Sequence, residues 1–286
     1  MFLIPIFAAV FFALIVFYYD RKYKKTSYYK NTKLSYLSVL NNSGRYGEYL
    51  AFKKLEKLEN SGAKFLFNVY IPKANGETTE IDMLMICSKG IFAFESKNYS
   101  GWIFGDENQN KWYQTLPSGK GKSHKESFYN PIMQNRSHVN HLHEYIDGVS
   151  PVYSVVVFSD KCTFMDLQIN SSDVGVVYLS QLNQAVLSVL NQNDDIILNE
   201  NDVIALYNQL YPCSQSSVAQ KAQHVQRVQS QKNVNYKDFS NNPKSLQCPK
   251  CGGALVLRTS KKGVNSGNQF YGCSNYPKCR YIRNIK

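Results

Sequence analysis

The chain lacks two features of small secreted proteins and repeat proteins: a regular cysteine framework and an internal repeat. Its seven cysteines are an odd number, and Cys87, Cys162 and Cys213 are scattered without a pairing pattern. This usage argues against a disulfide-stapled scaffold and is typical of a reducing compartment. The missing repeat argues against a solenoid. A length of 286 residues with 43% hydrophobic side chains suits one or two packed domains with accessory segments.

Charge is also missing from parts of the chain. Positions 244–286 hold nine lysines and arginines but no acidic residue, and positions 2–19 hold no charged residue at all. Positions 36–212, in contrast, hold fourteen basic and nineteen acidic residues. The net charge of +12 therefore conceals an acidic body between basic ends. Basic ends of this kind bind polyanions, which are either anionic lipids or nucleic acid.

The uncharged stretch 2–19 predicts a transmembrane anchor, because eighteen helical residues span about 27 Å, close to the thickness of a bilayer core. Four basic residues follow it and favour a cytoplasmic position for the rest of the chain: Arg21, Lys22, Lys24 and Lys25. A signal peptide and a buried core helix are the alternatives, but the stretch has neither a basic start nor a small-residue cleavage site. We expect a single-pass protein of the inner or plasma membrane, with residues 20–40 as a basic juxtamembrane stalk.

Hydrophobic spacing beyond position 40 predicts a mixture of helices and strands. Apolar residues at intervals of three and four predict a helix from Gly44 to about position 60, and Pro131 suits the first turn of another. The polar composition of 213–244 predicts a flexible linker. The expected strands are 65–71, 80–86, 91–97, 102–105, 111–115, 152–158 and 174–178, with further helices at 180–190 and 200–210 and a polar, basic loop at 117–127.

Two of these strands carry the side chains that point to a reaction. Strands 80–86 and 91–97 flank a short Ser-Lys-Gly turn, which predicts a β-hairpin. Alternation then places Glu95 and Lys97 on one side of the sheet. Asp82 and Glu95, aided by the carbonyl of Ser96, would hold Mg²⁺ or Mn²⁺, and Lys97 would orient water or meet charge on a phosphate. This set predicts hydrolysis of a phosphodiester.

Helical residues on either side of the hairpin extend this candidate site. Glu48, on the preceding helix, would reach the same metal or a second one. Gln134, one turn into the later helix, would contact phosphate or Lys97. Taken singly, each of these residues is more often a solvated surface side chain, so the argument depends on their joint occurrence.

Several segments together resemble the nuclease-related domain (NERD) family of the restriction-endonuclease-like PD-(D/E)xK superfamily. They are Gly44–Glu48, Glu80–Asp82, Gly90–Gly101, Trp112 and Asn130–Gln134. The resemblance implies a mixed sheet flanked by helices, an acidic metal ligand at Asp82, the E-x-K pair at Glu95 and Lys97, and supporting roles for Glu48 and Gln134. Ser96 departs from the apolar residue common at that position, which affects packing more than chemistry. Folds of this kind also serve as binding modules, so a non-catalytic nucleic-acid-binding or scaffold protein is the alternative.

The last cysteines have the spacing of a metal site. Cys248 and Cys251 form C-x2-C, and Cys273 and Cys279 form C-x5-C after twenty-one intervening residues. Four thiolates at such spacing predict a tetrahedral structural Zn²⁺ site, with disulfides as the alternative. A 43-residue segment with few large apolar residues would take most of its folding energy from the metal.

This segment resembles the zinc ribbon at the C-terminus of bacterial type I topoisomerases. Cys-Pro-x-Cys-Gly-Gly and Phe-Tyr-Gly-Cys-Ser-Asn-Tyr-Pro-x-Cys carry the resemblance, which implies association with single-stranded DNA. Basic charge and aromatic rings would supply phosphate contacts and stacking faces. The candidate nucleic-acid-binding residues are Arg258, Tyr271, Tyr276 and Arg280, together with Lys120 and Lys122 in the polar loop. A protein–protein role for the ribbon stays open.

The expected protein is thus an α/β protein with a restriction-endonuclease-like mixed sheet, an N-terminal transmembrane helix and a small C-terminal β zinc ribbon. Its expected function is Mg²⁺-dependent cleavage of nucleic acid, with DNA as the first choice, at the cytoplasmic side of a membrane. The expected organisation is an anchor at 2–19, a stalk at 20–40, a nuclease-related domain at 41–212 with its motifs at 44–150, a linker at 213–244 and a zinc ribbon at 245–286.

Overall fold

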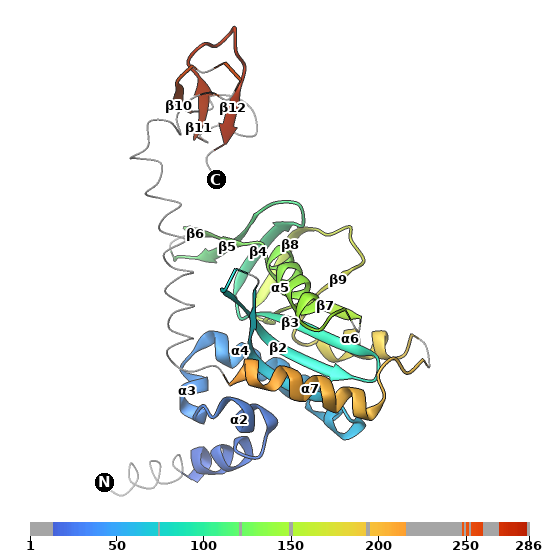
Figure 1. The fold of residues 1–286 in the computed structure, drawn as a ribbon. Helices are drawn as coiled ribbons and strands as arrows, with labels where there is room; N and C mark the ends of the chain where they lie inside the picture. The colour runs from blue at the N-terminus through green and yellow to red at the C-terminus, as the bar shows by residue number, and fades with distance from the viewer. Residues whose placement is uncertain are drawn as a thin grey trace, which may run out of the picture. The chain divides into compact units, whose positions relative to one another are not determined.

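The computed structural model describes residues 14–73, 75–119, 122–148, 151–192, 195–215, 248, 250–251, 253–259 and 269–284. The chain divides into two compact units, Met1–Val218 and Ala219–Lys286 (Figure 1). Lys120, the first part of the expected anchor and nearly all of the expected linker lie outside the described residues.

A five-stranded mixed sheet forms the centre of the first unit (Figure 1). Its strand order is β1-β2-β3-β7-β9. The first three strands form an antiparallel meander, which confirms the predicted hairpin, and β7 and β9 run parallel to β3. The strands are β1 (Lys64–Pro72), β2 (Thr78–Cys87), β3 (Gly90–Lys97), β7 (Val152–Phe158) and β9 (Val174–Tyr178).

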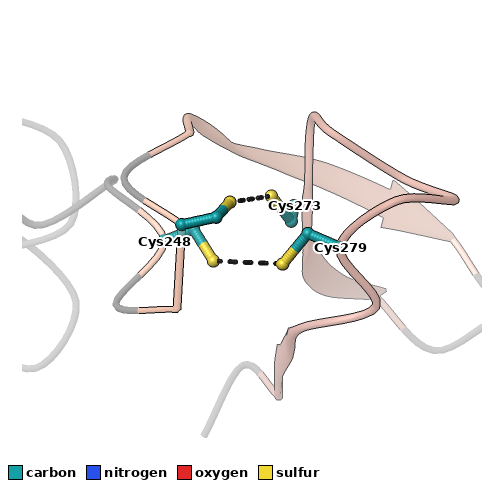
Figure 2. A group of neighbouring side chains, drawn as sticks. Cys248, Cys273 and Cys279 are labelled. Atoms are coloured by element: carbon teal, nitrogen blue, oxygen red, sulfur yellow. Dashed lines mark hydrogen bonds between the residues drawn. The ribbon is translucent and has the colours of Figure 1, made fainter.

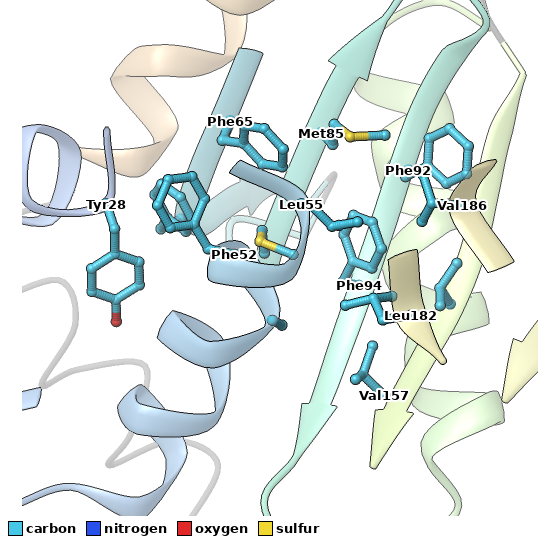
Figure 3. Packing of buried hydrophobic residues seen from close by; sticks show 14 of the residues in the cluster. Tyr28, Phe52, Leu55, Phe65, Met85, Phe92, Phe94, Val157, Leu182 and Val186 are labelled. Atoms are coloured by element: carbon cyan, nitrogen blue, oxygen red, sulfur yellow. The ribbon is translucent and has the colours of Figure 1, made fainter. Parts of the chain in front are cut away.

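Helices cover both faces of this sheet, because its strands are apolar on both sides. On one face, α4 (Ser43–Leu55) and α6 (Leu182–Leu190) pack on aromatic residues such as Phe92 and Phe94 (Figure 3). On the other, α5 (Pro131–Tyr145) and α7 (Glu200–Ser214) cover aliphatic residues. A 3₁₀ helix, η1 (Glu56–Ser61), follows α4. The expected mixed sheet with flanking helices is therefore confirmed.

A second, four-stranded sheet has the order β6-β5-β4-β8. The strands are β4 (Gly101–Asp106), β5 (Lys111–Pro117), β6 (Ser123–Tyr129) and β8 (Cys162–Gln168). The predictions for β4 and β5 are confirmed, but the expected loop at 117–127 is wrong for most of its length. Strand β6 runs through it as an exposed edge, pairing with β5 from Lys111↔Tyr129 to Pro117↔Ser123. An edge strand open to solvent carries no hydrophobic alternation that would reveal it.

Residues 20–40, the expected basic juxtamembrane stalk, are folded against the domain. They contain α2 (Ser27–Thr32) and α3 (Tyr36–Leu40), and α2 packs on β1. Tyr23 and Tyr28 are fully buried in the cluster shared with Phe52 and Phe67. Figure 3 shows Tyr28 and Phe52 of this cluster. The tyrosines of this basic segment supply the apolar area that packs against the domain.

Residues 14–23 are helical, and several of their apolar side chains are exposed: Leu14, Ile15, Phe17, Tyr18 and Tyr19. Among the described residues, none of the helices combines the length and the apolar character that a bilayer crossing requires.

The side-chain alternation of two strands reverses at one point of the central sheet. Phe67 and Met83 lie in the cluster beneath α4, whereas Val69 and Ile81, two residues away, lie in the cluster on the opposite face. The pairing register does not change across this point. Asn68, between the two pairs, has φ +51°, a left-handed conformation that Asn tolerates better than most residues. The reversal places the polar residues Asn68 and Asp82 between two apolar clusters.

The second unit contains a small antiparallel sheet of order β10-β11-β12. Its strands are β10 (Leu255–Thr259), β11 (Gln269–Cys273) and β12 (Ile282–Asn284). Among the described residues of this unit, the buried apolar side chains are those of Leu255 and three cysteines, with Tyr271 and Tyr281 packed against them. So small an apolar cluster supports the prediction that metal binding stabilises this unit.

Gly105 provides a test of the packing in the second sheet. A Cβ at this position would lie 2.2 Å from the Trp112 ring, which is fully buried. We expect Gly105→Ala to lower the free energy of unfolding by about 1–3 kcal/mol or more, because a rigid core has no room for the methyl group. Urea unfolding measures this, with Gly44→Ala in α4 as the control, since its nearest neighbour would lie 3.5 Å away. Equal stability of the two variants would contradict the packing described.

Candidate functional site

Asp82 and Glu95 lie close together at the point where the pairing of β2 with β3 ends. The register of β2 with β3 ends at the pair Met83↔Phe94, so Asp82 precedes the last paired residue of β2 and Glu95 follows that of β3. The backbone N–H of Ser96 donates to Asp82 Oδ2 at 2.8 Å, which fixes the carboxylate across the strand gap. Glu95 is buried and Asp82 is half-buried. The two carboxyl groups that sequence analysis singled out are therefore neighbours.

Lys97 lies beside this pair. Its Nζ donates to Glu95 Oε1 at 2.5 Å and to Gln134 Oε1 at 3.1 Å. Gln134 reaches this position because Asn130 caps α5, accepting from Ile132 N at 2.9 Å and donating to carbonyl groups of the β4–β5 turn. The structure thus brings together Asp82, Glu95, Lys97 and Gln134. Of the two contacts expected for Gln134, with phosphate or with Lys97, it shows the one with Lys97.

The charges of this group are strongly coupled. Burial raises the pKa of Asp82 well above its usual value, and the nearby carboxylates of Glu95 and Glu48 raise it further. Burial also opposes ionisation of Glu95, but the Lys97 ammonium and His138 outweigh it and hold the pKa of Glu95 below its usual value. Asp82 and Glu95 have one ammonium, that of Lys97, between them, so the pair has a deficit of positive charge. A bound cation would remove that deficit.

Glu48 is held by neutral donors rather than by Lys97. The amide of Asn68 donates to Glu48 Oε2 at 2.8 Å, and the Tyr28 hydroxyl donates to the same atom at 3.4 Å. Burial raises the pKa of Glu48 to about 7. Asn68, the left-handed residue of β1, therefore links that strand to Glu48 on α4.

His138 is a site residue that sequence analysis missed. Its Nδ1 lies 2.6 Å from Thr79 Oγ1, and its Nε2 lies 3.5 Å from Glu95 Oε2. His138 Nε2 and Glu95 Oε2 are both buried, and neither atom makes a hydrogen bond within normal distance. The signal was present, since His138 follows Gln134 by four residues and so shares its helix face. Sequence reasoning had no means to place Thr79 on the other side of the ring.

The donor set fits a hard divalent cation. Asp82 and Glu95 offer carboxylate oxygens and Ser96 a carbonyl, and Mg²⁺ is commonly held by one or two carboxylates with water completing its shell. Among the described residues, however, a group of three or more potential ligand side chains within mutual reach occurs only at the four cysteines. Glu48 therefore does not complete a three-carboxylate cage with Asp82 and Glu95 in this arrangement.

The four cysteines of the second unit converge as their spacing predicts. The Sγ atoms of Cys248, Cys251, Cys273 and Cys279 all lie within 4.8 Å of one another. Figure 2 shows the thiol groups turned toward a common centre, with Cys248 Sγ 3.7 Å from Cys279 Sγ. The Asn275 backbone N–H donates to Cys273 Sγ at 3.4 Å, a contact that stabilises a thiolate. Four sulfur donors at this separation fit a structural Zn²⁺ ion.

The candidate nucleic-acid-binding residues of the ribbon differ in exposure. The Arg258 guanidinium lies 5.8 Å from the centre of the Tyr276 ring, and both side chains are exposed. Arg280 is exposed as well, whereas Tyr271 is half-buried against the cysteines. Lys122, in the first unit, is exposed. Arg258 and Tyr276 therefore provide the ring and the charge that stacking on a nucleic acid requires.

Glu48 predicts a specific pH dependence. Its pKa is raised from 4.5 to about 7 in the folded protein, so its contribution to stability is complete below pH 4.5 and is lost as the pH rises to 7. We expect the parent to lose up to about 3 kcal/mol relative to Glu48→Gln over this interval. Urea unfolding at pH 5 and pH 7.5 without added divalent cation measures the difference. Parallel pH profiles for the two proteins would contradict the raised pKa.

The cysteine cluster predicts one zinc ion per chain. We expect the purified protein to release about one equivalent on thiol modification and Cys273→Ser to hold little or none, because three thiolates leave the tetrahedral site open. Elemental analysis with a colorimetric zinc indicator measures this. Cys162→Ser is the control, since that thiol donates to the Ser159 carbonyl in the first unit. Equal zinc content in the parent and Cys273→Ser would show that the cluster does not bind the metal.

Comparison with known proteins agrees with this geometry. Residues 43–159 match the family model of the nuclease-related domain, and residues 246–286 match that of the topoisomerase DNA-binding C4 zinc finger. No solved structure gives a significant match.

Individual relatives divide in the same way. An uncharacterized protein of Bacillus anthracis is 33% identical over 143 residues, which is 50% of this chain and 65% of the relative. DNA topoisomerase 1 of Methanocaldococcus jannaschii is 60% identical over 38 residues, which is 13% of this chain and 4% of that enzyme. An uncharacterized Escherichia coli protein is 51% identical over 39 residues, 14% of this chain and 19% of its own length. The chain thus spans less than two thirds of each of these relatives. It combines a nuclease-related domain at residues 43–159 with a topoisomerase-type C4 zinc ribbon at residues 246–286.

Proposed function

We propose that this protein is a metal-dependent nuclease that hydrolyses nucleic-acid phosphodiesters, with DNA as the first choice of substrate and Mg²⁺ or Mn²⁺ as the cofactor. The observation that carries the proposal is the set of Asp82, Glu95 and Lys97 at one point of two neighbouring strands. Two carboxylates beside an ammonium suit both a divalent cation and a scissile phosphate. The order and orientation of the strands are compatible with the expected restriction-endonuclease-like fold.

Each residue has a distinct part in this proposal. Asp82 and Glu95 hold the metal ion, which when bound supplies positive charge and an activated water. Lys97 orients that water or meets charge on the phosphate, and Gln134 fixes its ammonium by accepting at 3.1 Å. His138 steadies the second carboxylate oxygen of Glu95. Positioning of this kind accounts for much of the catalysis in phosphoryl transfer.

Glu48 has a separate part. With a pKa of about 7, its carboxyl group can take up or release a proton near neutral pH. Glu48 is hydrogen-bonded to Asn68 and Tyr28 and not to Lys97. Its proposed partner is therefore a solvent water or a second cation, and it does not act through Lys97.

The zinc ribbon is proposed to hold the nucleic acid near the nuclease-related domain. The C4 zinc finger family it matches is described as DNA binding in topoisomerases. Its exposed Arg258, Tyr276 and Arg280 offer charge and a stacking ring, and Tyr271 adds a partly exposed ring. The structural Zn²⁺ ion keeps these side chains on one small scaffold.

Membrane attachment is part of the proposal. The uncharged stretch 2–19 would form a single transmembrane anchor, and the basic residues after it would keep the remaining chain in the cytoplasm. The exposed apolar side chains of residues 14–19 support this, because apolar side chains in contact with water do not stabilise a helix end, whereas a bilayer would cover them. The folded segment 20–40 would then seat the domain directly beneath the bilayer.

A non-catalytic nucleic-acid-binding or scaffold role is the second candidate. It is favoured by the absence, among the described side chains, of a three-ligand cluster at the carboxylate site. In that case the carboxylates and Lys97 would form a structural ion-pair network beside the sheet.

Substitution of Asp82 separates the two candidates. We expect the protein to cleave labelled DNA with Mg²⁺ or Mn²⁺, and Asp82→Asn to reduce the rate by at least about 100-fold, since a carboxylate ligand becomes neutral. Electrophoresis of single- and double-stranded substrates measures cleavage. Glu144→Gln, an exposed carboxylate near the C-terminal end of α5, is the control and keeps the parent rate. Cleavage that is unchanged in Asp82→Asn would exclude this site, and no cleavage by the parent would favour the second candidate.

A further inference from the structure

The second sheet has two unlike faces. The registers Trp102↔Thr115 and Thr115↔Lys125 set three side chains in one row across β4, β5 and β6, because directly opposite residues share a face. Ile103 and Trp112 point the other way and are fully buried against β7 and α5. We call the first side the outer face. Its aromatic and basic residues on these three strands are Trp102, Phe104, Lys111, Tyr113, Lys125 and Tyr129.

Two of the four rings of the outer face, those of Trp102 and Tyr129, are open to solvent, and those of Phe104 and Tyr113 are half-buried. Trp102 is 49% exposed and Tyr129 is 54% exposed. None of the four rings on this face belongs to a buried cluster of the described residues. Lys125 Nζ lies 4.2 Å from the centre of the Tyr113 ring, so charge and ring are already paired.

The charge of the β5–β6 hairpin is opposite to that of the domain around it. Residues 111–129 hold four lysines and one glutamate, within an otherwise acidic body. Glu126 belongs to the inner row and pairs with His124 at 3.0 Å. Two carboxylates border the outer face, Asp106 at the end of β4 and Asp166 on β8 opposite Phe104. Positive charge therefore concentrates on the hairpin, beside the exposed rings.

We propose that the outer face of β4, β5 and β6 binds single-stranded nucleic acid by base stacking on Trp102 and its neighbouring rings. Bases of a single strand present free π-faces, whereas those of a duplex are stacked on one another. Lysines such as Lys125 then meet the phosphates between the stacked bases. The choice of nucleic acid over other polyanions rests on the proposed function. The rings and their exposure are observed independently of it.

The position of this face suits delivery of a strand to the candidate active site. Only four residues separate Lys97, at the end of β3, from Trp102, near the start of β4. At the maximum reach of an extended chain their Cα atoms lie within about 18 Å of each other. A short stretch of single strand covers that distance. A strand bound on the outer face would thus reach the carboxylates without a long unsupported span.

The two tryptophans of the chain allow a direct test, because one lies on the outer face and the other is fully buried. The full-length protein is titrated with a twenty-nucleotide oligothymidine, without added Mg²⁺, while tryptophan emission is recorded. We expect saturable quenching in the parent, no quenching in Trp102→Phe, and unchanged emission from Trp112. The matched duplex is expected to quench weakly. No quenching of the parent, or equal quenching by the duplex, overturns the proposal.

Affinity variants extend the test. In anisotropy titrations with labelled oligothymidine, we expect Trp102→Ala to weaken binding by about 5- to 150-fold, the range for loss of one stacking ring. Ile204→Ala, an exposed apolar residue on α7, is the control. We expect Lys125→Gln to reduce the slope of log affinity against log salt by about 0.7, and Lys54→Gln on α4 to leave it unchanged. Variants of the outer face that bind like their controls would contradict the proposal.

Other occupants would give different results. If the face joins two copies of this chain, Trp102→Ala will lower the oligomeric mass measured by light scattering without nucleic acid, and this overturns the proposal. If it lies on a membrane, anionic phosphatidylserine vesicles and not the oligonucleotide will quench Trp102, which also overturns it. Cleavage is assayed separately, so loss of stacking with normal cleavage contradicts this inference alone, while stacking without cleavage contradicts the proposed nuclease activity alone.

Discussion

The close approach of the Asp82 and Glu95 carboxyl groups is the constraint on which the candidate site depends. Two partly or fully buried acids side by side resist ionisation together, and here a third, Glu48, adds to that resistance. One ammonium, that of Lys97, offsets part of the repulsion. A divalent cation would offset the rest. The stability of the site and its chemistry are therefore coupled through the same charges.

The surrounding fold keeps these groups in place by uncharged contacts. Asn68 adopts a left-handed conformation where two strands reverse their alternation, and its amide holds Glu48. Asn130 begins α5 at a fixed point, so that Gln134 and His138, one turn apart, face Lys97 and Glu95. Such contacts orient the charged groups without changing their total charge. Pre-organisation of this kind is what a hydrolytic site needs before the substrate binds.

Much of the central architecture could be predicted from the sequence because its signals are local. Apolar runs and a Ser-Lys-Gly turn predicted the β2–β3 hairpin, and Asn130 with Pro131 predicted the start of α5. Cysteine spacing likewise predicted the cluster of four thiols. The nearness of Asp82 to Glu95 followed from the hairpin, since the two residues lie on neighbouring strands next to their last paired residues.

The remainder depended on contacts between distant segments. Strand β6 has exposed side chains along nearly its whole length, so no hydrophobic pattern marked it. Tyr23 and Tyr28 lie among basic residues, and only the cluster formed with Phe52 shows that they are buried. His138 acquires its meaning from Thr79, which is fifty-nine positions away in the chain. Local periodicity carries no information about such pairs.

The most direct test of the account is the binding of Mn²⁺ to the full-length protein, followed by electron paramagnetic resonance. The account predicts a bound ion in the first unit that is lost or much weakened in Asp82→Asn and in Glu95→Gln and is retained in Asp166→Asn. Binding of equal stoichiometry and affinity in the parent and in both of the first two variants would contradict the proposal that Asp82 and Glu95 hold a metal.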